Sequence, residues 1–328
     1  MSKNKMEAVR LQHIVKTYDK GKIVAVNDVS FSVNEGELFG LIGPDGAGKT
    51  SIFRILTTLL LADKGNANIL GLDVKDDYKA IRKLVGYMPG KFSLYQDLTV
   101  LENLRFFASI FGTTIQQNYD LIKDIYEQIA PFNQRRAGKL SGGMKQKLAL
   151  CCALIHKPSV LLLDEPTTGV DVVSRREFWD MLKALKQQGI TILVSTPYMD
   201  EAVLCERIAL IQEGKIMRVD TPDDIVKRYP TKLYAAKSAN IYQLLRDYRE
   251  NDAIESSYAF GEYLHVTLQR AEVDGTLMLR ELATHLGHKD VLVKEIQPGI
   301  EDSFIRLMEG ARATGNADYD NGKSNHMS

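Results

Sequence analysis

The stretch "GPDGAGKT", Gly43 to Thr50, decides the fold of this chain. It matches the pattern G-x-x-x-x-G-K-[ST], whose glycines let a loop wrap closely around the phosphates of a nucleotide. The strand-like run "GELFGLIG" leads into it, and "KTSIFRILTTLLL" continues from it with the length of a helix. Strand, loop and helix therefore come in the order of a phosphate-binding unit, and the sequence predicts an α/β fold of the P-loop NTPase type.

The residues of this loop have distinct predicted roles. The backbone N–H groups of the loop and the N-terminus of the following helix face the phosphate anions. We expect Lys49 to reach the β- and γ-phosphates and Thr50 to ligate Mg²⁺. The residues of this segment that we expect to bind the nucleotide are Gly43, Pro44, Asp45, Gly46, Ala47, Gly48, Lys49, Thr50 and Ser51.

A second motif, "LLLDEP", ends a continuous apolar run with two carboxylates. Asp164, at the end of a predicted buried strand, can hold Mg²⁺ through water, and Glu165 can orient the attacking water or take its proton. A solvated acidic turn is the alternative interpretation. The apolar strand favours the catalytic one, because α/β folds bind ligands at the carboxyl ends of their strands.

The composition excludes several classes of protein. The 42 basic and 42 acidic residues cancel, so no net field draws the chain to nucleic acid or anionic lipid. No apolar run approaches the ~18–20 residues that span a bilayer, and no signal-peptide core is visible, so we expect a cytoplasmic location. Cys151, Cys152 and Cys205 lack metal-ligand spacing and are expected to be reduced core thiols.

The chain divides into a large and a small predicted domain. Residues 1–225 contain the nucleotide motifs, with a β-rich segment near the start and a helical insert at about 92–156. The run "GITILVS" follows the helix-forming "SRREFWDMLKALKQQ" and completes a β-α-β crossover of parallel strands. Residues 226–311 mix short strands and helices and predict a small α+β domain, and the polar residues 312–328 predict a disordered tail.

A third motif, "KLSGGMKQKLAL", begins at Lys139 and contains Ser141, two glycines and then a helix whose N-terminus can face an anion. Alone, it is also consistent with a helix cap after a flexible turn. It lies between the phosphate loop and "LLLDEPTTGVD", and in this order it resembles the signature loop of the ABC-type ATPases. The resemblance covers residues 7 to 220. It points to the exporter type, close to the drug-export ATPases and to the first ATP-binding half of the fused exporter ATPases of the YbhF type.

The resemblance implies a head-to-tail dimer that encloses two ATP molecules, each between the phosphate loop of one subunit and the signature loop of the other. The residues that it implies at the partner's ATP are Ser141, Gly142, Gly143 and Met144. By the same resemblance Asp171 lies at the dimer junction, Tyr18 stacks on adenine and Val26 contacts the nucleotide. A core tyrosine is the alternative for Tyr18. The implied cofactors are ATP and Mg²⁺.

Two positions depart from the family pattern. Gly90 stands where the family has a glutamine that touches Mg²⁺ and the attacking water, and Pro197 stands where it has a histidine that bonds the γ-phosphate. Glycine has no side chain, and proline offers neither a side-chain donor nor a backbone N–H. We therefore expect a site that binds ATP but hydrolyses it slowly, in a protein that pairs with a second, unlike ATPase subunit. An active homodimer that tolerates both residues is the alternative.

The stretch "GKFSLYQDLTVLENL" places Phe92, Leu94, Tyr95 and Leu98 beside Gly90. In the family this region receives a short helix of a membrane permease subunit, and an apolar cleft suits such docking. The chain would then be the ATP-binding subunit of an exporter, peripheral on the inner face of the cell membrane. Two alternatives share the ATP motifs: a soluble ABC ATPase of translation or DNA repair, and a regulatory protein that senses ATP without turnover.

Overall fold

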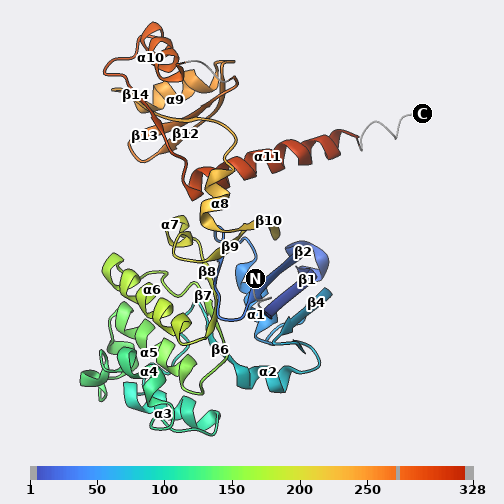
Figure 1. Cartoon of the computed structure of the whole chain (residues 1–328), viewed down its shortest axis with the longest axis vertical. Helices are drawn as coiled ribbons and strands as arrows, with labels where there is room; N and C mark the ends of the chain where they lie inside the picture. Colours follow the sequence, from blue (N-terminus) through green and yellow to red (C-terminus); the bar gives the residue numbers. More distant parts are fainter. Residues whose placement is uncertain (1–5, 271–273, 322–328) are drawn as a thin grey trace, which may run out of the picture. The chain divides into compact units, whose positions relative to one another are not determined.

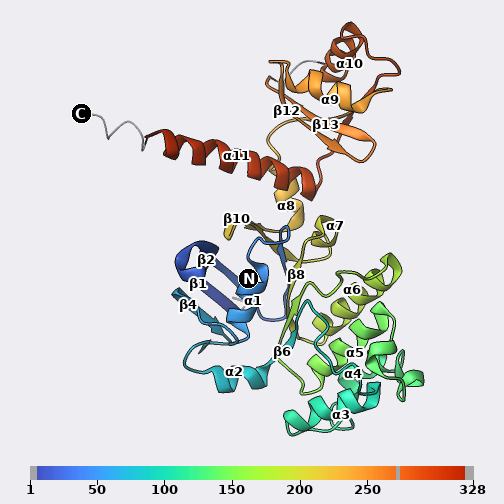
Figure 2. The ribbon, with the colours of Figure 1, turned by 180° about the vertical axis from the view of Figure 1, so that it is seen from behind.

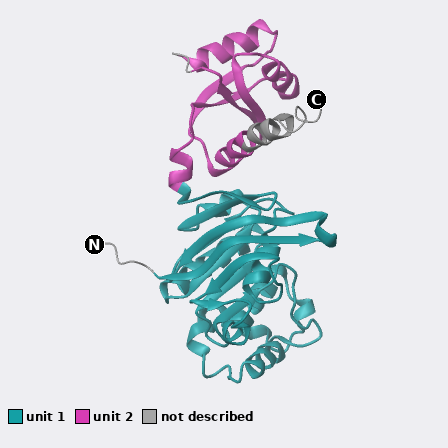
Figure 3. Cartoon of the chain, turned by 90° about the vertical axis from the view of Figure 1, so that its right-hand side faces the viewer, with its two compact units in different colours: residues 1–222 teal, residues 223–328 magenta. Residues whose placement is uncertain are grey.

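The computed structural model describes the backbone of residues 6–270 and 274–321, and the side chains of these segments up to residue 310. The chain forms two compact units, Met1–Pro222 and Asp223–Ser328, which Figure 3 shows in teal and magenta. The division lies close to the boundary expected at residue 225. Each unit has a hydrophobic core of its own.

A six-stranded sheet forms the centre of the larger unit. Its strand order is β10 (Lys215–Asp220), β9 (Arg207–Gln212), β3 (Leu38–Ile42), β8 (Thr191–Thr196), β7 (Val160–Asp164) and β6 (Val85–Met88). The strands from β9 to β6 run parallel, and β10 pairs antiparallel with β9. Every residue of β3, β7 and β8 is buried, as expected for largely apolar strands that are covered on both faces.

An antiparallel sheet shares the core of the parallel one. Its strand order is β2 (Ile23–Asn34), β1 (Glu7–Tyr18), β4 (Lys64–Ile69) and β5 (Leu72–Asp73). Helix α1 (Lys49–Leu56) follows β3, and its Phe53 belongs to one hydrophobic cluster with Leu11 of β1 and Leu162 of β7. Figure 1 shows β1, β2 and α1 in blue, close to one another. The phosphate-loop helix is thus fixed by both sheets.

Helices fill the segment between β6 and β7, shown in green in Figures 1 and 2. They are α3 (Val100–Ile110), α4 (Tyr119–Tyr126) and α5 (Gly142–Leu154). A capping box starts α3: the Thr99 hydroxyl accepts from the Glu102 N–H at 3.2 Å, and the Glu102 carboxylate accepts from the Thr99 N–H at 2.8 Å. The remaining helices of this unit are α2 (Tyr78–Leu84), α6 (Val172–Gln187) and α7 (Met199–Ala202), with 3₁₀ turns at Asp19–Gly21, Ala130–Phe132 and Ala137–Lys139.

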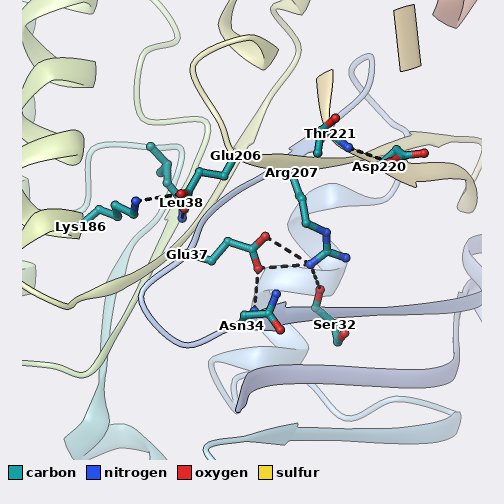
Figure 4. Close-up of polar contacts among 9 residues, drawn as sticks. All are labelled: Ser32, Asn34, Glu37, Leu38, Lys186, Glu206, Arg207, Asp220 and Thr221. Atoms are coloured by element: carbon teal, nitrogen blue, oxygen red, sulfur yellow. Dashed lines mark hydrogen bonds and ion pairs between the residues drawn. The ribbon is translucent and has the colours of Figure 1, made fainter. Parts of the chain in front are cut away.

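Polar contacts join neighbouring segments at the amino end of the parallel sheet, as Figure 4 shows. Glu37, which is 2% exposed, accepts from the Asn34 N–H at 2.7 Å, and both its oxygens lie 3.2 Å from Nη1 of Arg207. Beside this pair, Glu206 accepts from the Leu38 N–H at 3.2 Å and from Lys186 at 2.8 Å. These contacts connect the first residues of β3 and β9 and stabilise the scaffold away from the phosphate loop.

The smaller unit has the order β-α-β-β-α-β, typical of ferredoxin-like domains. Its elements are β11 (Leu233–Lys237), α9 (Ile241–Arg249), β12 (Ile254–Phe260), β13 (Tyr263–Leu268), α10 (Gly275–His285) and β14 (Leu292–Ile296). The sheet has the order β12-β13-β11-β14 and is antiparallel. Leu244 and Tyr248 of α9 pack with Tyr234 of β11 in its core. Helix α8 (Pro222–Lys227) starts at the last residue of the larger unit and continues into the smaller one.

Helix α11 (Ile300–Asn321) ends the described chain. Asp302 in its first turn accepts hydrogen bonds from Tyr258 at 2.7 Å and from Nδ1 of His265 at 2.6 Å, which tie the helix to β12 and β13. The helix continues through residues 312–321, which the polar composition predicts to be a disordered tail. The rest of that expected tail, residues 322–328, lies outside the described residues.

Candidate ATP-binding site

The phosphate loop lies between β3 and α1 and requires glycine at two positions. A Cβ atom on Gly43 would lie 2.2 Å from the carbonyl oxygen of Ile211, and a Cβ on Gly48 would lie 2.2 Å from that of Ala25. Gly48 also has a φ of +100° and forms the N-cap of α1. Only glycine combines this conformation with such close backbone contact. The first and last glycines of the motif are therefore needed for the loop to wrap tightly.

Lys49 is buried in the loop and surrounded by oxygen atoms. Its ammonium group donates to the carbonyl oxygens of Gly43 at 2.8 Å and Pro44 at 2.9 Å, and it lies 3.0 Å from Oε1 of Glu165. The lysine is 3% exposed, so these oxygens offset the cost of burying its charge. A phosphate group can replace the Glu165 carboxylate as the anionic partner of this ammonium group.

The two carboxylates of "LLLDEP" have different environments. Asp164 is 2% exposed and accepts from the Ser195 hydroxyl at 2.7 Å. Burial raises the pKa of Asp164, while hydrogen bonds from Ser195 and Thr50 oppose the increase. Glu165 has a φ of +51°, and its N–H donates to the Ser195 hydroxyl at 3.0 Å. Such backbone strain is characteristic of functional sites.

The hydroxyl of Thr50 and the carboxylate of Asp164 are the groups of this site that fit a magnesium ion. The Thr50 hydroxyl is close enough to Asp164 to lower the pKa of its carboxyl, so two hard oxygen donors lie near each other at the end of the phosphate loop. Mg²⁺ prefers such donors and completes its octahedral coordination with water and substrate phosphate oxygens. Within the described residues, no cluster of three or more His, Cys, Asp or Glu side chains forms a cage for a metal.

Gly90 and Pro197 lie on either side of these carboxylates. The strands β6, β7 and β8 are neighbours in the sheet, and Gly90, Asp164 and Pro197 come at or just after their respective carboxyl ends. A Cβ on Gly90 would lie 3.0 Å from the carbonyl oxygen of Asp164. Beside Pro197, the N–H of Tyr198 donates to the Thr196 hydroxyl at 3.1 Å. The fold thus brings both departures from the family pattern to one edge of the sheet.

The signature segment and the Asp171 segment are in close contact. Ser141 caps α5, because its hydroxyl accepts from the Met144 N–H at 3.3 Å. A Cβ on Gly143 would lie 2.6 Å from Oγ of Ser174. Asp171 caps α6 by accepting from the Ser174 N–H at 3.0 Å, and this hydrogen bond lowers the pKa of Asp171. The predicted signature residues and the predicted junction residue therefore form one surface region.

Two residues predicted at the nucleotide, Tyr18 and Val26, lie in different surroundings. Tyr18 is half-buried, and its hydroxyl lies 3.0 Å from Oγ of Ser51, so it is next to the phosphate-loop helix. Val26 is fully buried in the hydrophobic core. Its contact with the nucleotide stays a prediction. Sequence reasoning missed Ser195, whose only signal is a hydroxyl near the end of an apolar strand.

An apolar cleft of about 440 Å³ opens beside Gly90. Phe92 and Leu94 line it, together with Phe107 and Phe111. Tyr95 and Leu98, which the sequence analysis groups with them, are not among its lining residues, and Tyr95 is 51% exposed and contacts Phe106 edge to face. The three free cysteines are buried, as expected for core thiols, and Cys152 lies at the wall of this cleft.

Comparison with known proteins agrees with this geometry. Residues 26–168 match the family model described as ABC transporter. The chain is 37% identical over 292 residues to the probable multidrug ABC transporter ATP-binding protein YbhF of Escherichia coli, a match that covers 88% of this chain and 50% of YbhF. It therefore spans about half the length of that relative. It is 35% identical to the Nod factor export ATP-binding protein I of Bradyrhizobium diazoefficiens, covering 92% of this chain and 96% of that protein.

A solved structure supports the fold. A dimeric ATP-binding cassette in a post-hydrolysis state with ADP and phosphate matches with a TM-score of 0.59 at 26% identity, over 65% of this chain and 98% of that one. Along the described residues 6–270 and 274–321, no helix is both long and apolar enough to cross a membrane. The motifs, the parallel sheet with its phosphate loop, and a relative that matches over almost its full length agree: the chain belongs to the ABC transporter family.

Proposed function

We propose that this protein is the ATP-binding subunit of an ABC exporter and couples the binding and hydrolysis of ATP to transport by separate membrane subunits. The observation that carries the proposal is the position of Lys49, which is held by two carbonyl oxygens and by Glu165 at the carboxyl ends of the strands. The names of relatives, which refer to multidrug transport and Nod factor export, support an exporter. The protein would be cytoplasmic and bound to the membrane through its permease partners.

Nucleotide binding begins with an exchange of anions at Lys49. The phosphates of ATP take the place of the Glu165 carboxylate, which becomes free to orient water. Thr50 and Asp164 would hold Mg²⁺, which would supply positive charge against the negative charge that develops on the phosphates. Tyr18 provides an aromatic ring for the adenine. This assignment uses only residues that lie around the phosphate loop.

The protein's own site is proposed to hydrolyse ATP slowly. Gly90 has no side chain with which to hold Mg²⁺ or water, and Pro197 has no N–H group with which to bond the γ-phosphate. Loss of one preorganised catalytic donor costs about 10²–10³ in rate. Glu165 alone does not replace two missing donors. The site therefore holds ATP as a clamp through several turnovers elsewhere.

The signature segment serves a different site. Ser141, Gly142 and Gly143 are intact, and they adjoin Asp171 and the exposed Val172, which is 73% accessible. We propose that this surface meets a second ATPase subunit head to tail and completes that subunit's active site in trans. The unequal state of the two surfaces favours an unlike partner over a second copy. A fully active homodimer is the competing assembly.

The apolar cleft beside Gly90 is the proposed docking site for the permease. Its lining residues Phe92, Leu94 and Phe107 offer a hydrophobic surface to a short amphipathic helix. The cleft adjoins the carboxyl end of β6. A movement of the docked helix would therefore displace residues next to the ATP site.

Equilibrium dialysis of the purified full chain with radiolabelled ATP and Mg²⁺ tests the proposal. The variant Lys49→Ala should abolish detectable binding, because the phosphates lose their buried cation. Lys83→Ala, which removes an exposed lysine of α2, is the matched control and should bind as the wild type does. Unchanged affinity in the Lys49 variant would contradict the assignment of the phosphate site.

A further inference from the structure

A charged pocket of about 320 Å³ lies between α6 and α7 and has two unsatisfied polar atoms at its wall. Trp179 and Glu201 line it and are 2% and 3% exposed. Among the described side chains, Nε1 of Trp179 and Oε1 of Glu201 are buried without a hydrogen-bond partner. A buried polar atom without a partner lowers the stability of the folded state by about 1–3 kcal/mol, so two such atoms in one pocket require an explanation.

Arg175 is the cation nearest to the unpaired carboxylate oxygen. Its Nη1 lies 3.8 Å from Oε1 of Glu201, and its Nη2 lies 3.8 Å from Oδ2 of Asp200. Its guanidinium carbon stands 4.7 Å from the centre of the Tyr198 ring. Both ion pairs are longer than a hydrogen bond, which requires about 2.7–3.2 Å. A movement of about 1 Å would convert them into charge-assisted hydrogen bonds and satisfy Glu201.

This cluster connects the two functional regions of the larger unit. On one side, Arg175 follows Ser174, which packs against Gly143 of the signature segment and bonds Asp171. On the other side, Oε2 of Glu201 accepts from the Thr196 hydroxyl at 2.5 Å and from the Thr167 hydroxyl at 3.1 Å.

The two threonines place Glu201 next to the ATP site. Thr196 precedes Pro197, and Thr167 comes two residues after Glu165. A change at the end of β7 or β8 therefore reaches Arg175 through one carboxylate.

We infer that Arg175 is a positioning residue, which closes on Glu201 and Asp200 when ATP occupies the phosphate loop and so links that loop to the signature segment. The inference rests on the proposed ATP site. ATP displaces Glu165 from Lys49, and the segment that carries Glu165 and Thr167 shifts with it. Since Pro197 cannot bond a phosphate, the contacts of Glu201 provide the connection that the turn itself lacks. The open ion pairs leave room for this closure.

The protein contains its own reporter, because Trp179 is the single tryptophan of the sequence and lines this pocket. Addition of Mg–ATP to the full chain should change the intrinsic tryptophan emission. Arg175→Gln should lose that change while retaining ATP binding in equilibrium dialysis. Arg105→Gln is the matched control, because it removes the same charge from an exposed position on α3 that does not line this pocket, and it should keep the change.

The outcomes separate this inference from the proposed function. If wild-type protein binds ATP but its emission does not change, or if Arg175→Gln still shows the change, Arg175 is not a positioning residue. Absence of ATP binding by the wild type would instead overturn the proposed function. Should Arg175→Gln fail to fold, Arg175→Lys keeps the charge without the two-pronged geometry and should show a reduced change. Full retention in the lysine variant would also count against the inference.

Discussion

Each end of the parallel sheet pairs a carboxylate with a cation, but the carboxylate is the buried partner at the amino end and the cation is the buried partner at the carboxyl end. At the amino end, both oxygens of Glu37 face Arg207, and the Asn34 N–H adds a third contact. At the carboxyl end, Glu165 meets Lys49 through one oxygen at 3.0 Å, and its side chain is 21% exposed. The amino end is a closed structural pair, whereas the carboxyl end holds a pair whose anion can be exchanged.

Backbone conformation reinforces this difference. Glu165 has a φ of +51°, and strain of this kind costs about 1–3 kcal/mol. The residues of the Glu37 pair are absent from the described positions with positive φ. The strained residue thus belongs to the carboxyl end, where the nucleotide is proposed to bind. Three predictions test whether the two ends have these separate roles.

The largest effect is expected when the signature segment is changed in the assembled complex. Ser141→Ala should lower the ATPase rate of the complex by about 10²–10³, because a preorganised donor to the partner's ATP is lost. Glu165→Gln should lower it far less if, as proposed, this chain's own site contributes little turnover. The measurement is steady-state ATPase activity of the purified complex.

Stability measurements complete that experiment. Ser141→Ala removes the cap of α5 and should lower the free energy of unfolding by about 1 kcal/mol, too little to account for the loss of rate. Ser109→Ala, at an exposed serine of α3, is the control. Equal losses for Ser141 and Glu165 variants would indicate two equivalent active sites and contradict the asymmetric assembly.

A smaller effect is expected at the amino end of the sheet. Glu37→Gln should lower the free energy of unfolding by about 2 kcal/mol, because it leaves Arg207 without its counterion in a part-buried place. ATP affinity should not change, since the pair lies at the opposite end of the strands from the phosphate loop. Chemical denaturation and equilibrium dialysis measure the two quantities. A large loss of ATP affinity with normal stability would show that the amino end is not merely structural.

The sequence predicted the parts of the site that depend on local motifs. The phosphate loop was predictable because Gly43, Gly48 and Lys49 follow one another at the spacing that a phosphate-binding loop requires, directly after an apolar strand. Gly90 and Pro197 lie near each other because β6, β7 and β8 are neighbours in the sheet. Long-range packing sets this strand order, so the proximity could be inferred only from the family pattern. The complete burial of Val26 was not predictable, because the burial of a single strand residue depends on long-range packing.

The smaller unit shows the same limit. Its mixture of strands and helices was visible, but the order β12-β13-β11-β14 was not, because strand pairing is decided by contacts between distant residues. The contact of Asp302 with His265 joins residues 37 positions apart and anchors a helix that extends beyond the expected boundary at residue 311. Polar composition alone therefore underestimated the length of α11.

The smallest effect is expected when the missing donors are restored at the carboxyl end. The double variant Gly90→Gln with Pro197→His should raise ATP hydrolysis by the isolated chain by about tenfold, which is part of what two preorganised donors supply. Each single change should do less, because one group places the water and metal while the other holds the γ-phosphate, and groups that act as a unit are not additive.

The gain is limited because a Cβ at residue 90 lies 3.0 Å from the Asp164 carbonyl oxygen, so the backbone must shift. Gly90→Ala brings the same Cβ without the amide and separates crowding from chemistry. A double variant that binds ATP normally yet hydrolyses it no faster would show that these two positions do not limit the site, and fast hydrolysis by the unmodified chain would favour the homodimer.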